Sequence, residues 1–412
     1  MKGVKYLIIG NSAAAVGCVE GIRQVDQEGE ITIVSTEPHH VYSRPLISYL
    51  ILGKTDEQRM KYRGDDFYEK NGVTALLGRT ATKIDPDGKK VSLDDGSSLA
   101  YDKLLVATGS KPFVPPAEGL DQVEKSFTFM TLDSAKALAA ALTKESRVLI
   151  VGAGLIGLKC AEGITGKVAS IDVVDMADRI LPSILDEHGS AMVMEHIQKQ
   201  GIRFHLSTSV AQFKEGAAFL KNGEELPFDI LVMAVGVRPN TELVRDAGGE
   251  VGRGIVTDET CRTTLPDIYA AGDCTESWDV AAGQRRVLAL LPNAYMQGET
   301  AGIDMAGGER KYNKAIPMNA IGFWGLHIIT AGSYDGEAYV DEKPGAYKKL
   351  VTRDGVLKGY ILIGDVARAG IYTSMIRERT GLDTVDFELL KQKPQLMAFR
   401  RSDRAKMLGG AH

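Results

Sequence analysis

Two glycine-rich stretches of matching pattern are the features of this sequence that could carry chemistry. The chain reads "KYLIIGNSAAAVGCVEGI" over residues 5–22 and "RVLIVGAGLIGLKCAEGI" over residues 147–164, and an ungapped overlay places Gly10 on Gly152. In each stretch an apolar run meets glycine and is followed by small residues. This order predicts a strand, a tight turn and a helix whose free N–H groups can bind a phosphate.

The second stretch contains the complete G-x-G-x-x-G fingerprint of a dinucleotide-binding unit. In this fingerprint the first glycine allows the turn, the second lets the backbone approach a pyrophosphate, and the third packs the helix against the strand. The three positions are Gly152, Gly154 and Gly157. The first stretch has Gly10, Ser12 and Ala15 there, so taken alone it also fits an ordinary strand-to-helix turn.

An acidic residue follows each loop where a ribose would lie. The segments "ITIVSTE" (31–37) and "SIDVVD" (170–175) predict second strands that end in Glu37 and Asp175. A carboxylate at this place accepts hydrogen bonds from a ribose diol and repels a 2′-phosphate. A solvated strand end is the alternative for either acid. The full order of strand, loop, helix, strand and acid favours two bound dinucleotides.

The overall composition is that of a soluble protein with a large core. The chain has 412 residues, of which 44% are hydrophobic and 25% charged, and a formal net charge of −5. This length predicts two or three domains, and the slight excess of acids argues against broad binding to nucleic acid or an anionic membrane. No apolar run approaches the roughly 18 residues of a membrane span. We expect a cytoplasmic protein.

The four cysteines show no pattern of a metal or redox site. They include no C-x-x-C pair and no pair at the spacing of zinc or iron–sulfur ligands. We therefore expect reduced thiols and no metal bound by this chain. The cysteines are Cys18, Cys160, Cys261 and Cys274.

Two further stretches connect the glycine loops to a known family. The segments "LLVATGSKP" (104–112) and "LPDIYAAGDC" (265–274) are apolar runs that end in glycine turns, and each alone predicts only a buried strand and a turn. Together with the two loops they resemble the flavin-dependent pyridine nucleotide oxidoreductases, which include glutathione reductase and ferredoxin reductases. The resemblance covers nearly the whole chain. It implies an α/β fold with two Rossmann-like domains, one for FAD and one for NAD(H), and an α+β C-terminal domain.

The resemblance also implies the domain boundaries. The "ATG" at Ala107–Gly109 would cross from the flavin domain to the nicotinamide domain, and "VGVRPN" (235–240) would cross back. The C-terminal domain covers the flavin in this family and often forms a dimer interface. The implied domains are the FAD-binding domain, 1–110 and 241–312, the NAD-binding domain, 111–240, and the C-terminal interface domain, 313–412.

The same resemblance assigns cofactor contacts. Asp273 matches the carboxylate that holds the ribityl chain of the flavin, and Pro292 opens a helix whose positive N-terminus the family points at the flavin ring. A surface helix that begins with proline is the alternative for Pro292. The residues expected to contact FAD are Gly10, Ser12, Ala13, Ala14, Glu37, Arg44, Pro45, Ala107, Thr108, Gly109, Gly272, Asp273, Pro292 and Asn293. Those expected to contact NAD(H) are Gly152, Gly154, Leu155, Ile156, Gly157, Asp175, Val235 and Gly236.

The segment after the first helix separates this chain from the disulfide reductases of the family. Those enzymes need a redox-active cysteine in the region that here reads "HHVYSRPLISYLILG" (39–53), where Ser43 stands and no thiol occurs. A serine cannot store electrons, so thiol–disulfide exchange is excluded. "YSRPLIS" resembles instead the loop of NADH:rubredoxin reductases and of the flavin module of nitrite reductases, where Arg44 and Pro45 lie near the flavin. Related ferredoxin reductases often have lysine at the position of Tyr49.

Lys159 reverses a charge that much of the family keeps. Many members have glutamate two residues after the third glycine, directed toward the nicotinamide and the flavin. We hypothesise that Lys159 is a catalytic residue, with Arg44 and Pro45, that faces the flavin ring and raises its reduction potential. The alternative is an ion pair with Glu162, three residues further along the same helix.

The resemblance implies an oxidoreductase that transfers electrons between NADH and a separate iron–sulfur protein such as a rubredoxin or ferredoxin. Asp175 predicts a preference for NADH over NADPH. The alternatives are an FAD- and NAD(H)-binding subunit of a larger aldehyde, formate or nitrite oxidoreductase, and a stand-alone NADH oxidase. We expect a homodimer or hetero-oligomer, and neither nucleic acid nor membrane as a partner.

Overall fold

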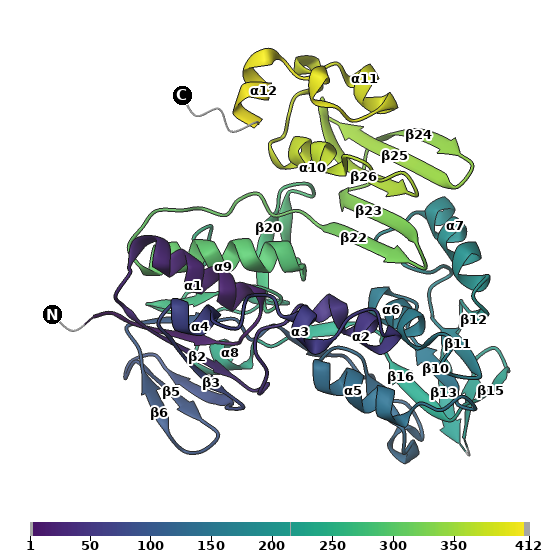
Figure 1. The fold of residues 1–412 in the computed structure, drawn as a ribbon, viewed down its shortest axis with the longest axis horizontal. Helices are drawn as coiled ribbons and strands as arrows, with labels where there is room; N and C mark the ends of the chain where they lie inside the picture. The colour runs from purple at the N-terminus through teal and green to yellow at the C-terminus, as the bar shows by residue number, and fades with distance from the viewer. Residues whose placement is uncertain (1–2, 215, 408–412) are drawn as a thin grey trace. The chain divides into compact units, whose positions relative to one another are not determined.

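A computed structural model describes residues 3–214 and 216–407. In this structure the first glycine loop follows the middle strand of a parallel sheet (Figure 1). That strand, β1 (Lys5–Ile9), lies in a five-stranded sheet of order β19-β7-β1-β2-β3. Its apolar side chains are buried, as expected for a strand covered on both faces. The other strands are β2 (Glu30–Ser35), β3 (Val73–Leu77), β7 (Lys103–Val106) and β19 (Ile268–Ala270).

The second glycine loop leaves the middle strand of a second parallel sheet. This strand, β10 (Arg147–Val151), lies in the order β12-β11-β10-β16-β9. The other strands are β9 (Ser126–Thr128), β11 (Ser170–Val174), β12 (Ile202–His205) and β16 (Ile230–Met233). All neighbours run parallel. Two Rossmann-like sheets in one chain confirm the predicted α/β class.

The helices that follow the two loops pack against different partners. Helix α1 (Ala13–Val25) lies beside α9 (Leu291–Met305) (Figure 1). A Cβ atom on Gly17 would lie 2.2 Å from the carbonyl oxygen of Tyr295, so the two backbones approach too closely for a side chain there. Helix α6 (Leu155–Ile164) packs instead against α2 (Ile47–Leu52). The position that matches Gly17 therefore has room for Lys159.

The chain divides into two units, and both sheets belong to the first. This unit comprises residues 1–181, 197–277 and 286–313, and the second comprises residues 182–196, 278–285 and 314–412. Within the first unit, β8 (Ser110–Pro112) pairs antiparallel with β17 (Val237–Pro239), where the chain crosses between the two sheets. Helix α5 (Leu132–Ala141) begins at a capping box formed by Thr131 and Ser134.

The remaining elements of the first unit are short. Its helices are α3 (Glu57–Met60), α4 (Phe67–Lys70) and α8 (Glu242–Asp246). Its strands are β4 (Ala81–Asp85), β5 (Lys90–Leu93), β6 (Ser98–Ala100), β13 (Val210–Lys214), β14 (Ala217–Leu220), β15 (Glu225–Pro227) and β18 (Ile255–Val256). Three elements cross the boundary between the units, namely α7 (Glu187–Gln198), β20 (Thr275–Asp279) and β21 (Gln284–Val287).

The second unit is built on an antiparallel sheet of order β22-β23-β26-β25-β24. Strands β25 and β26, which follow one another in the chain, form a hairpin whose turn residues, Asp354 and Gly355, have φ angles of 53° and 72°. The strands are β22 (Met318–Phe323), β23 (Leu326–Gly332), β24 (Glu337–Lys343), β25 (Ala346–Arg353) and β26 (Val356–Ile363). The helices are α10 (Ala369–Arg377), α11 (Phe387–Gln392) and α12 (Arg401–Met407). Among the described residues, no helix has both the length and the apolar character needed to cross a membrane.

Candidate cofactor sites

A cavity of about 590 Å³ lies in the first unit, where the loops after β1, β2, β7 and β19 meet. These loops follow the carboxyl ends of parallel strands, and the strand order changes direction between β1 and β7. Ligands of open α/β sheets bind at such a switch point. The residues expected to contact FAD that line this cavity are Gly10, Ser12, Ala13, Ala14, Glu37, Arg44, Pro45, Ala107, Thr108, Gly109, Gly272 and Asp273.

The first glycine loop approaches the neighbouring strand too closely for any residue but glycine. Gly10 has a φ of 115°, and a Cβ atom there would lie 2.1 Å from the carbonyl oxygen of Ala107. Ser12, which precedes α1, makes no capping hydrogen bond with its side chain to any described residue. The first N–H groups of α1 therefore face the cavity with their positive dipole end available to a phosphate.

Helix α9 borders the cavity with residues next to the expected ones. Leu291 and Ala294 line the cavity, whereas Pro292 and Asn293 are not among its lining residues in the described chain. Positions three apart share one face of a helix, so the expected pair lies off the face that borders the cavity. The side chain of Asn293 is buried and accepts a hydrogen bond from the hydroxyl of Tyr312 at 2.6 Å.

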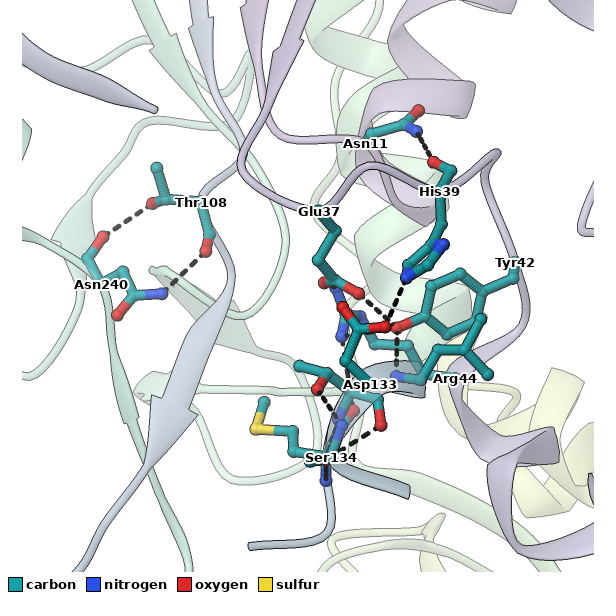
Figure 2. A network of polar contacts seen from close by, with 12 residues as sticks. Asn11, Glu37, His39, Tyr42, Arg44, Thr108, Asp133, Ser134 and Asn240 are labelled. Carbon is teal, nitrogen blue, oxygen red and sulfur yellow. Dashed lines mark hydrogen bonds and ion pairs between the residues drawn. The ribbon is translucent and has the colours of Figure 1, made fainter. Parts of the chain in front are cut away.

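Glu37 is held by two side chains from the loop that follows it (Figure 2). Its carboxylate pairs with the Nη2 atom of Arg44 and accepts a 2.6 Å hydrogen bond from the hydroxyl of Tyr42. Burial acts to lower the pKa of Arg44, but Tyr42 and Glu37 more than offset it and raise that pKa above its ordinary value. Each carboxylate oxygen of Glu37 keeps a lone pair that a ribose hydroxyl can use.

Asp273 and Ser110 provide polar groups that a polyol chain would satisfy. Burial raises the pKa of Asp273, and the charge of Arg44, with a smaller effect of Ser110, opposes that rise. The buried hydroxyl of Ser110 makes no hydrogen bond of ordinary distance and angle to any described residue. A half-buried carboxyl and a buried hydroxyl without a full set of partners fit the ribityl chain of a flavin. The residues of the cavity therefore fit FAD.

Several lining residues were not predicted from the sequence. Arg79, Thr80 and Thr82 line the cavity, yet their segment carries no motif and reaches the site only through the tertiary fold. Asn240, the last residue of "VGVRPN", donates from its side chain to the carbonyl of Thr108 at 2.8 Å. The hydroxyl of Thr108 donates in return to the carbonyl of Asn240 at 2.7 Å (Figure 2). This reciprocal pair fixes the crossover between the two sheets.

The glycines of the second loop have separate structural roles. Gly152 has a φ of 118°, and a Cβ atom there would lie 2.3 Å from the carbonyl oxygen of Ala234. A Cβ atom on Gly157 would lie 2.0 Å from the carbonyl oxygen of Gly152, so this glycine lets α6 pack against β10. A Cβ atom on Gly154 would meet no described protein atom within 4 Å. The open space at Gly154 is where a dinucleotide would approach the backbone.

Asp175 braces the second loop through backbone amides. Its two carboxylate oxygens accept hydrogen bonds from the N–H of Ala153 at 2.6 Å and of Ala177 at 2.8 Å. Leu155 and Ile156 form the first turn of α6. Val235 and Gly236 follow β16, with the nitrogen of Val235 3.1 Å from the Cβ position of Gly152. All the residues expected to contact NAD(H) thus belong to the glycine loop, the adjacent acid and the next strand end.

Lys159 forms the ion pair that the sequence offered as its alternative role. Its ammonium group pairs with the carboxylate of Glu162 and lies 4.4 Å from the centroid of the Tyr49 ring. The side chain of Glu162 is buried, at 4% exposed, and that of Lys159 is half-buried, at 18%. Lys159 does not line the cavity that fits FAD. A role of Lys159 at the flavin ring remains a hypothesis.

The thiols lie outside any redox site. All four cysteines are buried and none forms a disulfide bond. Burial raises the pKa of each thiol, to about 11 for Cys274, so none forms a reactive thiolate at neutral pH. Among the described residues, no group of His, Cys, Asp and Glu side chains could hold a metal ion.

Comparisons with known proteins agree with this arrangement. The chain is 33% identical over 395 residues to the NADH-dependent phenylglyoxylate dehydrogenase subunit epsilon of Aromatoleum evansii, covering 93% of each chain. It is 30% identical over 392 residues to the assimilatory nitrate reductase electron transfer subunit of Bacillus subtilis, covering 92% of this chain but only 50% of that protein. Its fold matches the covalent putidaredoxin reductase–putidaredoxin complex with a TM-score of 0.88 at 23% identity, covering 95% and 97% of the two chains. The model of the pyridine nucleotide-disulphide oxidoreductase family matches residues 4–298, and the chain belongs to that family.

Proposed function

We propose that this protein is an FAD-containing oxidoreductase that transfers electrons between NADH and a protein electron carrier, without a redox-active disulfide. The observation that carries the proposal is the presence of two strand–loop–helix units of the dinucleotide-binding type, after β1 and after β10, with Ser43 where a disulfide reductase needs a thiol. When bound, FAD would accept a hydride and release electrons singly, which suits an exchange between NADH and an iron–sulfur centre.

The residues of this chain would bind and orient the two cofactors. Glu37 and Arg44 would hold the adenosine end of FAD, and Asp273 with Ser110 would hold its ribityl chain. The loop at Gly154 would bind the pyrophosphate of NADH at the N-terminus of α6. These assignments imply FAD-binding residues 1–110 and 241–312, NAD-binding residues 111–240 and a C-terminal domain from residue 313.

The carrier is either a separate protein or a neighbouring subunit. Two of the similar proteins are named as subunits of larger enzymes, which favours a hetero-oligomer in which a partner supplies the iron–sulfur centre. A rubredoxin or ferredoxin, with this protein as a homodimer, is the second candidate. We also propose a cytoplasmic location, which the unpaired cysteines support.

NADH turnover with different acceptors tests the proposal. The purified protein should contain FAD, reduce ferricyanide and a rubredoxin or ferredoxin with NADH at about 1 s⁻¹ or faster, and reduce oxygen far more slowly. Oxygen turnover as fast as ferricyanide turnover would establish an NADH oxidase instead. FMN in place of FAD, or comparable rates with glutathione or coenzyme A disulfide, would refute the assignment.

The coenzyme preference follows from Asp175. The carboxylate of Asp175 would face the 2′-phosphate of NADPH. The nearby Arg179 donates to Asp178 at 2.8 Å, so the positive charge that Arg179 could offer to this phosphate is partly neutralised. We expect kcat/KM for NADH to exceed that for NADPH by about tenfold or more, a difference of about 1.4 kcal/mol. Asp175→Asn should reduce this ratio, whereas Asp178→Asn should change it less. Equal values of kcat/KM in the parent protein would contradict the expectation.

A further inference from the structure

Three contacts join the segment around Glu37 to the start of α5 (Figure 2). The Nε2 atom of His39 lies 2.8 Å from a carboxylate oxygen of Asp133. The backbone N–H of Leu132 donates to the hydroxyl of Tyr42 at 2.9 Å. Arg44 donates to the carbonyl of Met130 at 3.4 Å. The segment with the adenosine-binding acid is thus tied to the helix that follows β9 of the second sheet.

The hydroxyl of Tyr42 is the centre of this connection. A phenol offers one donor and two acceptor sites, and all three are used here. It donates to Glu37 at 2.6 Å and accepts from Leu132 at 2.9 Å and from Arg44 at 3.3 Å. The side chain is only 8% exposed. Burial raises its pKa above the ordinary value, so the hydroxyl keeps its proton at neutral pH and the direction of the bond to Glu37 is fixed.

Only some residues of this hydrogen-bonded network line the cavity. Glu37, Arg44 and Met130 line the cavity, whereas Tyr42 and Leu132 do not. A ligand that contacts Glu37 and Arg44 would restrict both groups that share the hydroxyl of Tyr42. The hydroxyl would then hold the N–H of Leu132, the first residue of α5, more persistently.

We propose that Tyr42 is a positioning residue that couples occupancy of the flavin site to the order of the start of α5. The inference rests on the proposed function in one respect, since it takes FAD as the ligand of the cavity. The coupling is reciprocal, because two linked binding and ordering events must affect each other equally. Loss of the bond at Leu132 should therefore weaken FAD binding from outside the cavity.

Hydrogen exchange of the Leu132 amide tests the coupling in Tyr42→Phe. In the parent protein, FAD should slow this exchange about tenfold relative to the FAD-free protein, and in Tyr42→Phe most of that effect should be lost. The control is Tyr6→Phe, because Tyr6 is also buried and its hydroxyl donates to Asp26 at 2.9 Å away from the cavity. The control should keep the full effect. Equal slowing by FAD in Tyr42→Phe and in the parent would overturn the proposal.

A second pair of variants leaves Tyr42 intact. Leu132→Pro removes the N–H donor at the first helical position, where proline is tolerated, and the preceding Thr131 already has the extended φ and ψ of −110° and 163° that precede proline. Leu132→Ala removes the same buried side chain but keeps the N–H. FAD affinity, measured by quenching of flavin fluorescence, should fall about fivefold more in Leu132→Pro than in Leu132→Ala, as expected for one lost hydrogen bond.

The same titrations separate this proposal from the proposed function. A parent protein that binds no FAD would refute both. A parent that binds FAD while Leu132→Pro and Leu132→Ala have equal affinities would refute the coupling alone.

Discussion

The two dinucleotide units hold their acidic residues in different ways. Glu37 is held by the side chains of Arg44 and Tyr42 from the loop that follows it, whereas Asp175 is held by the backbone amides of Ala153 and Ala177. The first arrangement continues through the hydroxyl of Tyr42 to the backbone N–H of Leu132, whereas the second joins the acid to the glycine loop through Ala153. A cofactor that stays bound suits the first, and a substrate that exchanges in every turnover suits the second.

The helices after the two loops differ in the same sense. Gly17 of α1 lies against the backbone of α9, and Lys159 of α6 occupies the matching position beside Tyr49 of α2. Helix α1, which lies against the backbone of the 15-residue α9, needs the glycine, while α6, which packs against the six-residue α2, accepts a paired side chain at this position. A repeated sequence unit has thus been adapted to two different neighbours.

The largest effects should come from alanine at the first glycine of each loop. Gly10→Ala and Gly152→Ala each force a methyl group to within 2.1 Å and 2.3 Å of a carbonyl oxygen at a positive φ. Each should reduce the free energy of unfolding by about 3 kcal/mol or more, as measured by urea denaturation. If each glycine loop serves only its own cofactor, Gly10→Ala loses FAD, while Gly152→Ala keeps FAD and loses reduction by NADH. Loss of FAD from both variants would contradict this separation.

Gly154→Ala should affect the NADH site without affecting the fold. No described atom lies within 4 Å of its Cβ position, so the free energy of unfolding should change by less than about 0.5 kcal/mol. The methyl group would occupy the space where the pyrophosphate approaches, so KM for NADH should rise about tenfold. Gly370→Ala, also in open space but in α10 of the second unit, is the control and should leave KM unchanged. An unchanged KM in Gly154→Ala would place the dinucleotide elsewhere.

Asp273→Asn should improve stability and impair function. The folded state raises the pKa of Asp273, so it binds the proton more tightly than the unfolded chain, and stability falls as the pH rises above the unfolded value of 3.8. The FAD-free variant should therefore be about 1 kcal/mol more stable than the FAD-free parent at pH 7, and this gain should disappear below the unfolded pKa. Its FAD affinity should fall. Thermal unfolding of the FAD-free proteins at pH 7 and at a pH below 3.8 measures this difference in stability. A variant less stable than the parent at pH 7 would refute the prediction.

The smallest effect should come from Lys159. A lone cation about 5 Å from a flavin would raise the two-electron potential by about 70 mV, but Glu162 cancels the charge of this one. Lys159→Gln should therefore lower the midpoint potential by less than about 20 mV. Glu162→Gln should raise the midpoint potential by a larger amount, because it leaves the charge of the Lys159 ammonium group uncompensated. The midpoint potential of the double variant should be close to that of the parent. A fall of several tens of millivolts in Lys159→Gln would support the flavin-facing hypothesis instead.

The sequence predicted the parts of the fold that local patterns determine. The apolar runs before Gly10 and Gly152 became the middle strands of two parallel sheets. Glycine loops and strand ends have strict local requirements, so their residue types are informative without a structure.

Contacts between distant side chains could not be predicted in this way. Nothing in the sequence indicates that Tyr42 bonds to Leu132, or that Arg79 reaches the cavity, because both depend on how separate segments pack. The pairing of Lys159 with Glu162 could be foreseen from helical spacing, but its burial could not. That burial comes from the packing of α6 against α2.

The contact between α1 and α9 also constrains the order in which the protein can mature. A ribosome makes α1 before the second sheet and α9 only after that whole sheet, since α1 ends at Val25, β16 ends at Met233 and α9 begins at Leu291. Domains generally fold as they are synthesised. The second sheet is therefore complete before α9 exists to pack against Gly17 of α1 and before Asp273 has been made. A nascent chain stalled between these two points would present a finished second sheet attached to a first sheet whose helix α1 has no helix to pack against.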